Sequence, residues 1–221
     1  MIKKIVLIGA GNVATHLGSA LCGAGCDVVQ VYSRTKESAM ELADKLSAEY
    51  TVSVDGIRCD ADMYIVALKD SALQELLPML VKGREQAFFV HTAGSMPMDI
   101  WKGYLSHYGV FYPMQTFSKQ RAADFATVPF FVEAGGETEL KMLKELAGKL
   151  SPKVYEATSE QRKYLHIAAV FACNFANHMY ALSARILEKH HIPFEVMLSL
   201  IDETAKKVHE LPPAKAQTGP A

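Results

Sequence analysis

Residues 3–14 decide the fold: Lys3-Lys4-Ile5-Val6-Leu7-Ile8 runs directly into Gly9-Ala10-Gly11-Asn12-Val13-Ala14. The first half is a short, continuous apolar run, which is the pattern of a strand buried on both faces of a sheet. The second half has the spacing G-x-G-x-x-A, which is typical of the turn between the first strand and first helix of a dinucleotide-binding unit. A second apolar strand is predicted over residues 28–32, at the distance that a β-α-β unit requires.

Each residue of this turn has a physical reason to be there. Gly9 permits the tight bend out of the strand, and Gly11 has no Cβ, so a pyrophosphate can approach the backbone. Ala14 is small enough for the helix to pack on the strand. The N–H groups at Asn12 and Val13 then face the phosphates, together with the positive end of the helix dipole. The alternative is a glycine-rich turn with only a structural role, which the flanking strand and helix make the weaker interpretation.

The end of the second strand indicates which dinucleotide is bound. An NAD-selective enzyme usually places Asp or Glu there, to accept a hydrogen bond from the ribose 2′-hydroxyl. This chain has Ser33, Arg34 and Thr35 instead, with no carboxylate before Glu37. A guanidinium and two hydroxyls suit a 2′-phosphate, which a carboxylate would repel, so the sequence predicts NADP. A compatible interpretation is that Ser33 or Thr35 caps the next helix while Arg34 is solvated.

Composition narrows the function classes. The 221 residues are half hydrophobic and carry a net charge of −1, which gives no electrostatic basis for binding nucleic acid or an anionic membrane. The four cysteines have no metal-binding or redox spacing, so no metal site is predicted. The first apolar run ends at once in glycines, unlike a signal peptide, and no apolar run is long enough to span a bilayer. A cytoplasmic location is therefore expected.

Helices and strands alternate over residues 1–157, which predicts an α/β domain with a doubly wound, mostly parallel sheet. Further strands are expected at residues 50–52, 63–68, 87–90, 128–133 and 153–155, and helices at 36–46, 72–81 and 137–150. Residues 109–117 are expected to form a sixth strand that runs into a loop. Ligands of such sheets bind outside the carboxyl ends of the strands. Leu68, His91, Thr92 and Ala93 are therefore predicted to border the nicotinamide end of the cofactor.

A second, all-helical domain is predicted over residues 158–221, with helices at 159–190 and 194–211. The first of these helices is apolar nearly all round, which indicates burial against the first domain or a partner subunit. One polar stripe interrupts it, because at about 100° per residue four side chains fall on one face: Lys163, His166, Asn174 and Asn177. Buried polar groups need partners, so the stripe lines either an internal network or a wet cleft that holds a substrate.

The whole chain resembles the bacterial Rossmann-like proteins with a helical DUF2520 domain. These are related to the F420-dependent NADP oxidoreductases, pyrroline-5-carboxylate reductase and the β-hydroxyacid dehydrogenases. The glycine turn carries the resemblance together with three later segments, HTAGS at 91–95, YPMQTF at 112–117 and KYLHIAAVFACNF at 163–175. The resemblance implies NADP binding, a homodimer assembled through the helical domain, and a reductase activity on a small-molecule substrate.

The sequence departs from the related families in two places. The β-hydroxyacid dehydrogenases place Lys and Asn four residues apart on the first helix of the second domain, whereas Lys163 is followed at that spacing by Ile167. The match to the catalytic pair of those enzymes is therefore incomplete, with Asn174 eleven residues after Lys163 on the same predicted face. In the resembling proteins the Thr-Gly-Pro at residues 218–220 leads into further helices, so the resemblance suggests that this chain is truncated and lacks part of its dimer interface.

Three hypotheses follow for the function. In the first, NADPH reduces a small carbonyl, imine or deazaflavin; Lys163 or His166 donates a proton or hydrogen bond, and Asn174 and Asn177 orient the substrate. In the second, the protein is a non-catalytic dimer that senses NADP(H) or a metabolite, which fits the lack of a complete catalytic set. In the third, the chain is a structural subunit of another enzyme.

Overall fold

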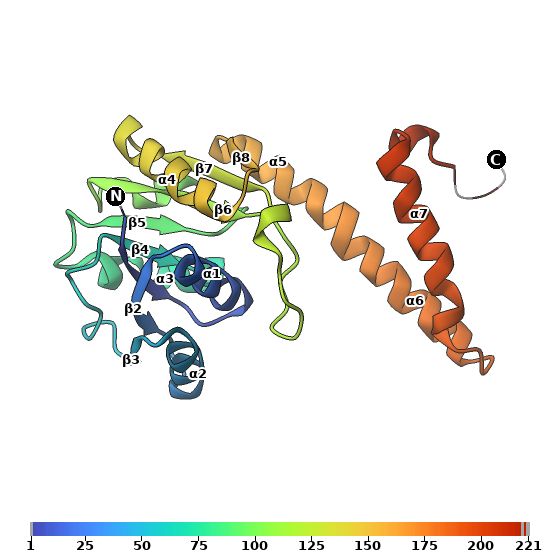
Figure 1. Cartoon of the computed structure of the whole chain (residues 1–221), viewed down its shortest axis with the longest axis horizontal. Coiled ribbons are helices and arrows are strands. Elements are labelled where there is room, and N and C mark those ends of the chain that lie inside the picture. Colours follow the sequence, from blue (N-terminus) through green and yellow to red (C-terminus); the bar gives the residue numbers. More distant parts are fainter. Residues whose placement is uncertain (1, 218, 220–221) are drawn as a thin grey trace. The chain divides into compact units, whose positions relative to one another are not determined.

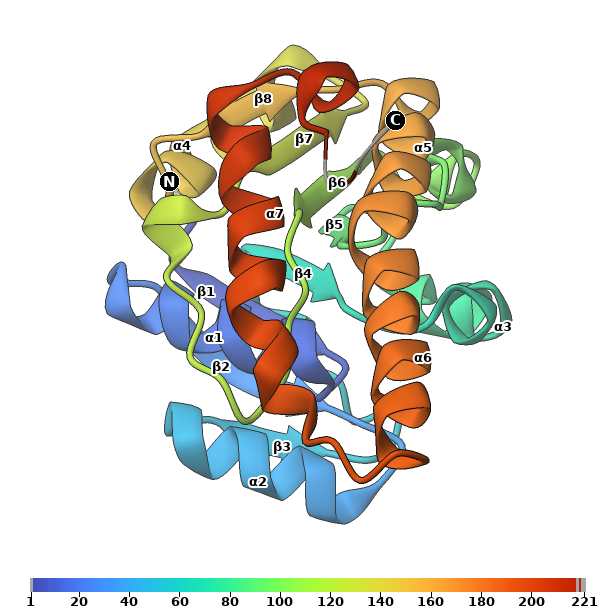
Figure 2. The same ribbon diagram turned by 90° about the vertical axis from the view of Figure 1, so that its right-hand side faces the viewer.

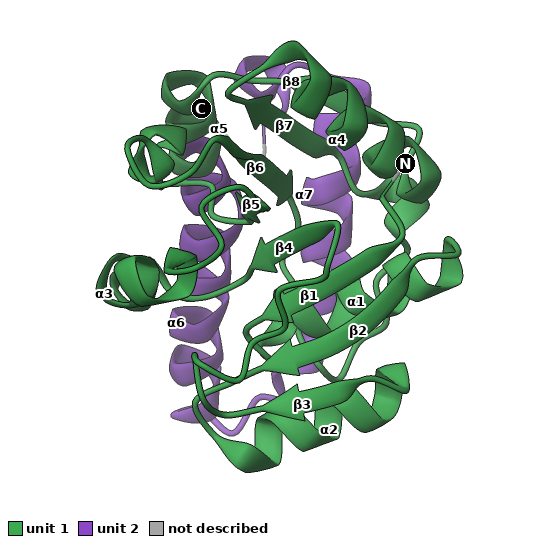
Figure 3. Cartoon of the chain, turned by 90° about the vertical axis from the view of Figure 1, so that its left-hand side faces the viewer, with its two compact units in different colours: residues 1–167 green, residues 168–221 purple. Residues whose placement is uncertain are grey.

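The computed structural model describes residues 2–217 and 219, and the chain divides into two compact units, residues 1–167 and 168–221 (Figures 1 and 3). The domain boundary predicted after residue 157 concerns which parts of the chain fold independently, and it stays a prediction. Thr218, Pro220 and Ala221, on which the suggestion of a truncated chain partly rests, lie outside the described residues.

The first unit is built on one eight-stranded sheet with the strand order β3-β2-β1-β4-β5-β6-β7-β8. Its strands are β1 (Lys4–Ile8), β2 (Asp27–Tyr32), β3 (Glu49–Thr51), β4 (Met63–Val66), β5 (Phe88–His91), β6 (His107–Pro113), β7 (Phe130–Ala134) and β8 (Val154–Glu156). Its helices are α1 (Asn12–Gly23), α2 (Lys36–Leu46), α3 (Asp70–Val81), α4 (Glu137–Leu150), the beginning of α5 (Ser159–Ala169), and the short 3₁₀ turns η1 (Met98–Trp101) and η2 (Phe125–Thr127).

The predicted fold class is confirmed. The order of the first six strands is that of a dinucleotide-binding sheet, and all of these strands are parallel. Only β6 and β7 pair antiparallel, with Gly109 opposite Ala134 and Pro113 opposite Phe130. A parallel return needs a crossover, usually a helix, whereas β6 and β7 are joined by a loop with one short 3₁₀ turn.

The core lies on both faces of the sheet, because alternate residues of the central strands point to opposite sides. Ile5 and Leu7 of β1 belong to a cluster that includes Leu17 of α1, whereas Val6 of β1 belongs to a second cluster that includes Leu73 of α3. Helices α1 and α3 therefore cover opposite faces (Figure 2). This packing holds the carboxyl ends of β1, β4, β5 and β6 at one edge of the sheet.

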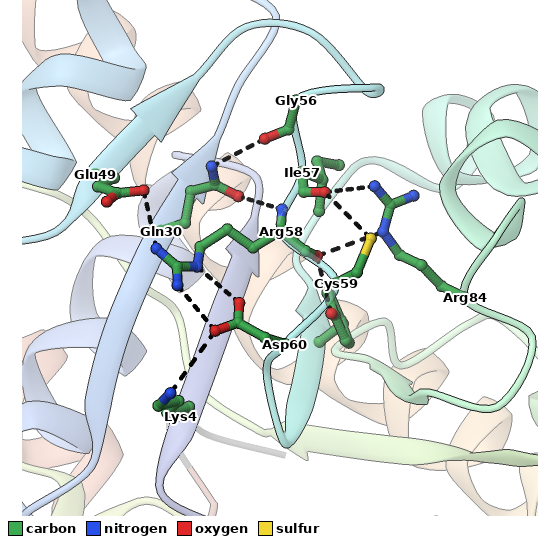
Figure 4. A network of polar contacts seen from close by, with 10 residues as sticks. Lys4, Gln30, Glu49, Gly56, Ile57, Arg58, Cys59, Asp60 and Arg84 are labelled. Carbon is green, nitrogen blue, oxygen red and sulfur yellow. Dashed lines mark hydrogen bonds and ion pairs between the residues drawn. The ribbon is translucent and has the colours of Figure 1, made fainter.

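A polar network ties together the opposite edge, at the amino ends of the strands (Figure 4). Arg58 donates to Asp60 at 2.8 Å and forms an ion pair with Glu49 at 3.2 Å. Hydrogen bonds from Arg58 lower the pKa of Asp60 to about 2. The buried Arg84 donates to the carbonyl of Ile57 and so fixes the loop before β4. These cations are already paired and lie away from the candidate site.

The helical unit begins with the last two residues of α5, just before a π-helical segment. Its elements are η3 (Val170–Phe175), which is the π segment, α6 (Ala176–Glu188), η4 (Phe194–Met197), α7 (Leu198–Glu210) and η5 (Pro213–Lys215). The helical run predicted over residues 159–190 is found over residues 159–188, but its middle is a π segment, through which an α-helical period of about 100° per residue does not hold. In the described part of η3, α6 and α7, no side chain is fully buried.

Candidate functional site

The two glycines of the glycine turn have different surroundings. Gly9 has a φ of +118°, and a methyl group in place of its hydrogen would lie 2.4 Å from the carbonyl oxygen of Ala67. Only glycine fits there. By contrast, a methyl group on Gly11 would meet no described atom within 4 Å. The space over Gly11 is therefore open, and a diphosphate can occupy it.

Helix α1 supplies the donors for this space. Gly11 is its N-cap, has no side chain to cap the helix, and is followed by no acidic residue in the first turn. The first N–H groups of a helix lack intrahelical acceptors, so those at Asn12 and Val13 can bind an anion. The side chain of Asn12 is turned elsewhere, since its amide donates to the carbonyl of Phe117 at 2.9 Å. Asn12 therefore offers its backbone, rather than its side chain, to a cofactor.

The predicted 2′-phosphate corner lies at the same edge of the sheet. The N–H of Gly9 donates to the carbonyl of Tyr32 at 2.8 Å, which places the turn beside the residue that precedes Ser33. Ser33 is half-buried, whereas Arg34 and Thr35 are exposed. Arg34 takes part in none of the ion pairs found among the described residues. Its guanidinium is therefore available to a phosphate, so the residues present fit NADP.

The residues predicted at the nicotinamide end follow β4 and β5. A methyl group on Gly9 would lie 3.4 Å from Leu68, so this leucine borders the glycine turn. The N–H of Thr92 donates to the carbonyl of Val66 at 3.1 Å, and Ala93 is half-buried beside it. The structure thus brings these predicted residues to one edge. His91 differs, because its ring is fully buried, so any contact with a cofactor falls to its backbone.

His91 is kept neutral inside the protein. Its Nδ1 accepts a hydrogen bond from the N–H of Ala93 at 3.2 Å, and its ring lies 6.0 Å from that of Trp101. Burial, and secondly the charge of Arg162, lower the pKa of His91 to about 3. The ring of His91 therefore stays uncharged in the folded protein at neutral pH.

We expect this histidine to make the first unit sensitive to acid. The unfolded chain binds a proton near the ordinary pKa of 6.5 and the folded protein only near pH 3, so the free energy of unfolding falls as the pH is lowered between these values. In His91→Gln the slope should be shallower by up to about 1.4 kcal/mol per pH unit. Urea unfolding at several pH values measures it, and His209→Gln, an exposed histidine, should keep the wild-type slope.

Of the predicted catalytic residues, His166 has a contact with the segment that follows β5. A methyl group on Gly94, just after β5, would lie 3.1 Å from Nδ1 of His166 and 3.0 Å from the hydroxyl oxygen of Tyr112. His166 is half-buried and Lys163 exposed. Asn174 lies in the π segment, so the angular argument that aligned it with His166 no longer applies. The roles of Lys163, His166 and Asn174 stay predictions.

The sequence did not indicate two further polar clusters near this edge. Ser95 donates to a carboxylate oxygen of Asp70 at 2.5 Å, which joins the segment after β5 to the start of α3. Arg162 of α5 is fully buried, forms an ion pair with Glu133 of β7, and donates to the carbonyl of Met96 at 2.6 Å. No local signal singled out Arg162, because its partner Glu133 lies 29 residues away in the sequence.

Comparison with known proteins identifies the family. Residues 4–93 match the family described as "NADP oxidoreductase coenzyme F420-dependent", and residues 128–221 match "Domain of unknown function (DUF2520)". The solved structure of "putative NADP oxidoreductase BF3122" from Bacteroides fragilis is 61% identical, with a TM-score of 0.95 over 99% of this chain and 85% of that one. The chain belongs to the DUF2520 family. This confirms the resemblance inferred from the sequence.

More distant structures share the fold of this DUF2520 protein. Protein TM1727 from Thermotoga maritima is 20% identical, with a TM-score of 0.80 over 98% of this chain and 84% of that one. A reductive aminase from Aspergillus terreus is 13% identical, with a TM-score of 0.73 over 95% and 75% of the two chains. No curated protein matches the sequence.

Two further observations concern metals and membranes. Within the described residues, no group of three or more His, Cys, Asp or Glu side chains is placed to hold a metal ion. None of the described helices combines the length and the apolar character needed to cross a membrane.

Proposed function

We propose that this DUF2520 protein is an NADP-dependent oxidoreductase that transfers hydride between NADP(H) and a small carbonyl, imine or deazaflavin substrate. The observation that carries the proposal is the open space over Gly11, bordered by the first turn of α1 and lying at the same sheet edge as Arg34, which has no ion pair with any described residue. The family membership supports it, as do the printed names of BF3122 and of the F420-dependent family.

In this proposal, each group of residues has a separate role in binding or catalysis. The backbone at Gly11 and the first turn of α1 bind the diphosphate, while Ser33, Arg34 and Thr35 bind the 2′-phosphate. NADPH supplies the hydride when bound. Leu68 and the backbone of residues 91–93 hold the nicotinamide end, and His166 takes part in supplying the proton that the reduction consumes.

Arg34 should decide between the two cofactors. We expect Arg34→Ala to weaken NADPH binding about 10-fold to 100-fold, because a charge-assisted hydrogen bond to phosphate is lost, and to leave NADH binding unchanged. Isothermal titration calorimetry measures both affinities. Lys45→Ala removes an exposed cation from the other end of α2 and should alter neither. Equal losses for NADPH and NADH would contradict the assignment of Arg34 to the 2′-phosphate.

A homodimer through the helical unit belongs to the same proposal. Large apolar side chains are exposed along this unit, including Phe171 at 64% and Ile186 at 62%, and Phe171 packs edge to face on Phe175 at 5.0 Å. Exposed apolar surface of this kind is typical of an interface.

Sedimentation equilibrium should therefore give twice the chain mass of 24.3 kDa for the wild type and the single mass for Phe171→Glu. Tyr155→Glu changes an aromatic residue of the sheet unit that is 51% exposed, and it should remain a dimer. A wild-type protein that is monomeric at micromolar concentration would contradict the proposed homodimer.

A non-catalytic sensor of NADP(H) is the second candidate. A screen of NADPH oxidation over keto acids, imines and a deazaflavin distinguishes the two, since an enzyme turns over at least one class. Tight NADPH binding without turnover of any class would favour the sensor.

A further inference from the structure

Two side chains that can carry a proton converge over Gly94. A methyl group at this position would lie 2.8 Å from Cζ of Tyr112, 3.0 Å from its hydroxyl oxygen and 3.1 Å from Nδ1 of His166. The phenol and the imidazole therefore approach the same point above the backbone, and only glycine leaves that point free.

The sheet places this point at the cofactor edge. Gly94 follows the carboxyl end of β5, and Tyr112 lies at the carboxyl end of β6, which pairs with β5 in parallel. Leu68 and the glycine turn lie at the same edge. Ligands of a doubly wound sheet bind outside this edge, so the phenol is placed beside the expected nicotinamide.

Rigid neighbours hold both groups. The ring of Tyr112 lies 6.4 Å from that of Phe131 on β7. One helical turn before His166, the fully buried Arg162 is bound to Glu133 and to the carbonyl of Met96, which fixes α5 against the sheet. A proton donor held by such packing needs little rearrangement when a substrate binds.

We propose that Tyr112 is the proton donor of this site and that His166 is the group with which it exchanges the proton. The proposal rests on the proposed reductase function. The O–H bond of Tyr112 breaks as its proton passes to the carbonyl oxygen or imine nitrogen of the substrate. The phenolate then takes a proton from Nδ1 of the doubly protonated His166 ring, which becomes a neutral imidazole and is later reprotonated from solvent. The hydride, one hydrogen with two electrons, comes from NADPH, which is left as NADP⁺, so the product gains one hydride and one proton.

The surroundings of Tyr112 suit this role better than those of Lys163. Tyr112 is half-buried, and its hydroxyl has no hydrogen bond to any described residue, so it is free for a substrate. Burial raises the pKa of Tyr112, against a smaller opposing effect of Arg162, and the phenol therefore keeps its proton at neutral pH. Lys163 is exposed to solvent.

The charged groups nearby are few. On β7 and α5, Glu133 and Arg162 are paired with each other. On β5, His91 stays neutral down to about pH 3, and at the start of α3 Asp70 accepts a hydrogen bond from Ser95. Histidine is the residue type that changes its charge between about pH 5 and 8, so His166 is the expected source of a pH effect on Tyr112.

Nuclear magnetic resonance of the full chain, labelled with ¹³C at Cζ of tyrosine, tests the pair without any substrate. We expect the Tyr112 signal, assigned with Tyr112→Phe, to show an inflection that coincides with the titration of the His166 ring in the same sample. His166→Gln should abolish the inflection. His107→Gln should keep it, because His107 is bound to Glu139 at the amino end of β6. A Tyr112 signal that does not respond to His166 would overturn the pairing.

Kinetics test the donor role. Tyr112→Phe should lower kcat about 10²-fold to 10⁴-fold and leave the calorimetric affinity for NADPH unchanged. Tyr108→Phe makes the same chemical change at the other end of β6 and should have the wild-type kcat. Normal turnover by Tyr112→Phe overturns the proposal. An absence of NADPH binding by the wild type instead removes the reductase function, while the resonance experiment still decides whether the two side chains interact.

Discussion

Arg162→Ala is expected to lower the free energy of unfolding of the sheet unit by about 3 kcal/mol, because removing one partner of a buried ion pair leaves the other charge uncompensated. Arg162 is fully buried, and the side chain of Glu133 is only 17% exposed. The substitution also removes the donor to the carbonyl of Met96. The remaining hydrogen bonds from Ser159 to Glu133 limit the loss to the lower end of the usual range.

Urea unfolding followed by tryptophan fluorescence measures this loss. The chain has one tryptophan, Trp101, which is fully buried in the sheet unit and therefore reports on that unit alone. Lys163→Ala changes the adjacent, exposed cation and should stay within about 0.5 kcal/mol of the wild type. The double variant Arg162→Met/Glu133→Gln should recover part of the loss. Equal stability of Arg162→Ala and Lys163→Ala would show that the buried pair contributes nothing.

Alanine substitutions at the two glycines of the turn should affect stability and NADPH binding differently. In Gly9→Ala the new methyl group meets the Ala67 carbonyl and the φ of +118° is strained, so we expect a loss of about 2–4 kcal/mol in stability together with the loss of NADPH binding. In Gly11→Ala the methyl group meets no described atom, so stability should be unchanged. It occupies the space proposed for the diphosphate, however, and NADPH affinity should fall by at least about 100-fold.

Gly148→Ala is the matched control for both. Gly148 lies within α4, and a methyl group there also meets no described atom within 4 Å. Alanine is the better helix former, so this variant should gain about 0.5–1 kcal/mol and bind NADPH normally. Melting temperature and calorimetry on the three variants give the comparison. Wild-type NADPH affinity in Gly11→Ala would contradict the placement of the diphosphate.

The features that could be predicted from the sequence are those that local patterns determine. Continuous apolar runs located the buried strands, and the glycine spacing located the turn, because both depend on residues close together in the chain. The antiparallel pairing of β6 and β7 was not predicted, since it depends on the missing crossover helix.

The site was less predictable, because its side chains come from distant segments. Arg162 lies between Gln161 and Lys163, both exposed, and only the fold reveals that its partner is Glu133. Tyr112 belonged to a segment that carried the family resemblance, yet nothing local to it indicated that His166 and Gly94 would lie beside its hydroxyl. The π segment could not be predicted either, because its residues have the composition of an ordinary apolar helix.

The lengths of the outermost strands have a consequence for association between molecules. Any open sheet ends in strands whose unpaired N–H and C=O groups can pair with another chain and start aggregation. Here β3 and β8 occupy these positions, and each is only three residues long. The seven-residue β6 is shielded on both sides, by β5 and by β7. The sheet therefore offers little template for edge-to-edge growth, so that a variant with a disrupted helical unit should not aggregate through its sheet edges.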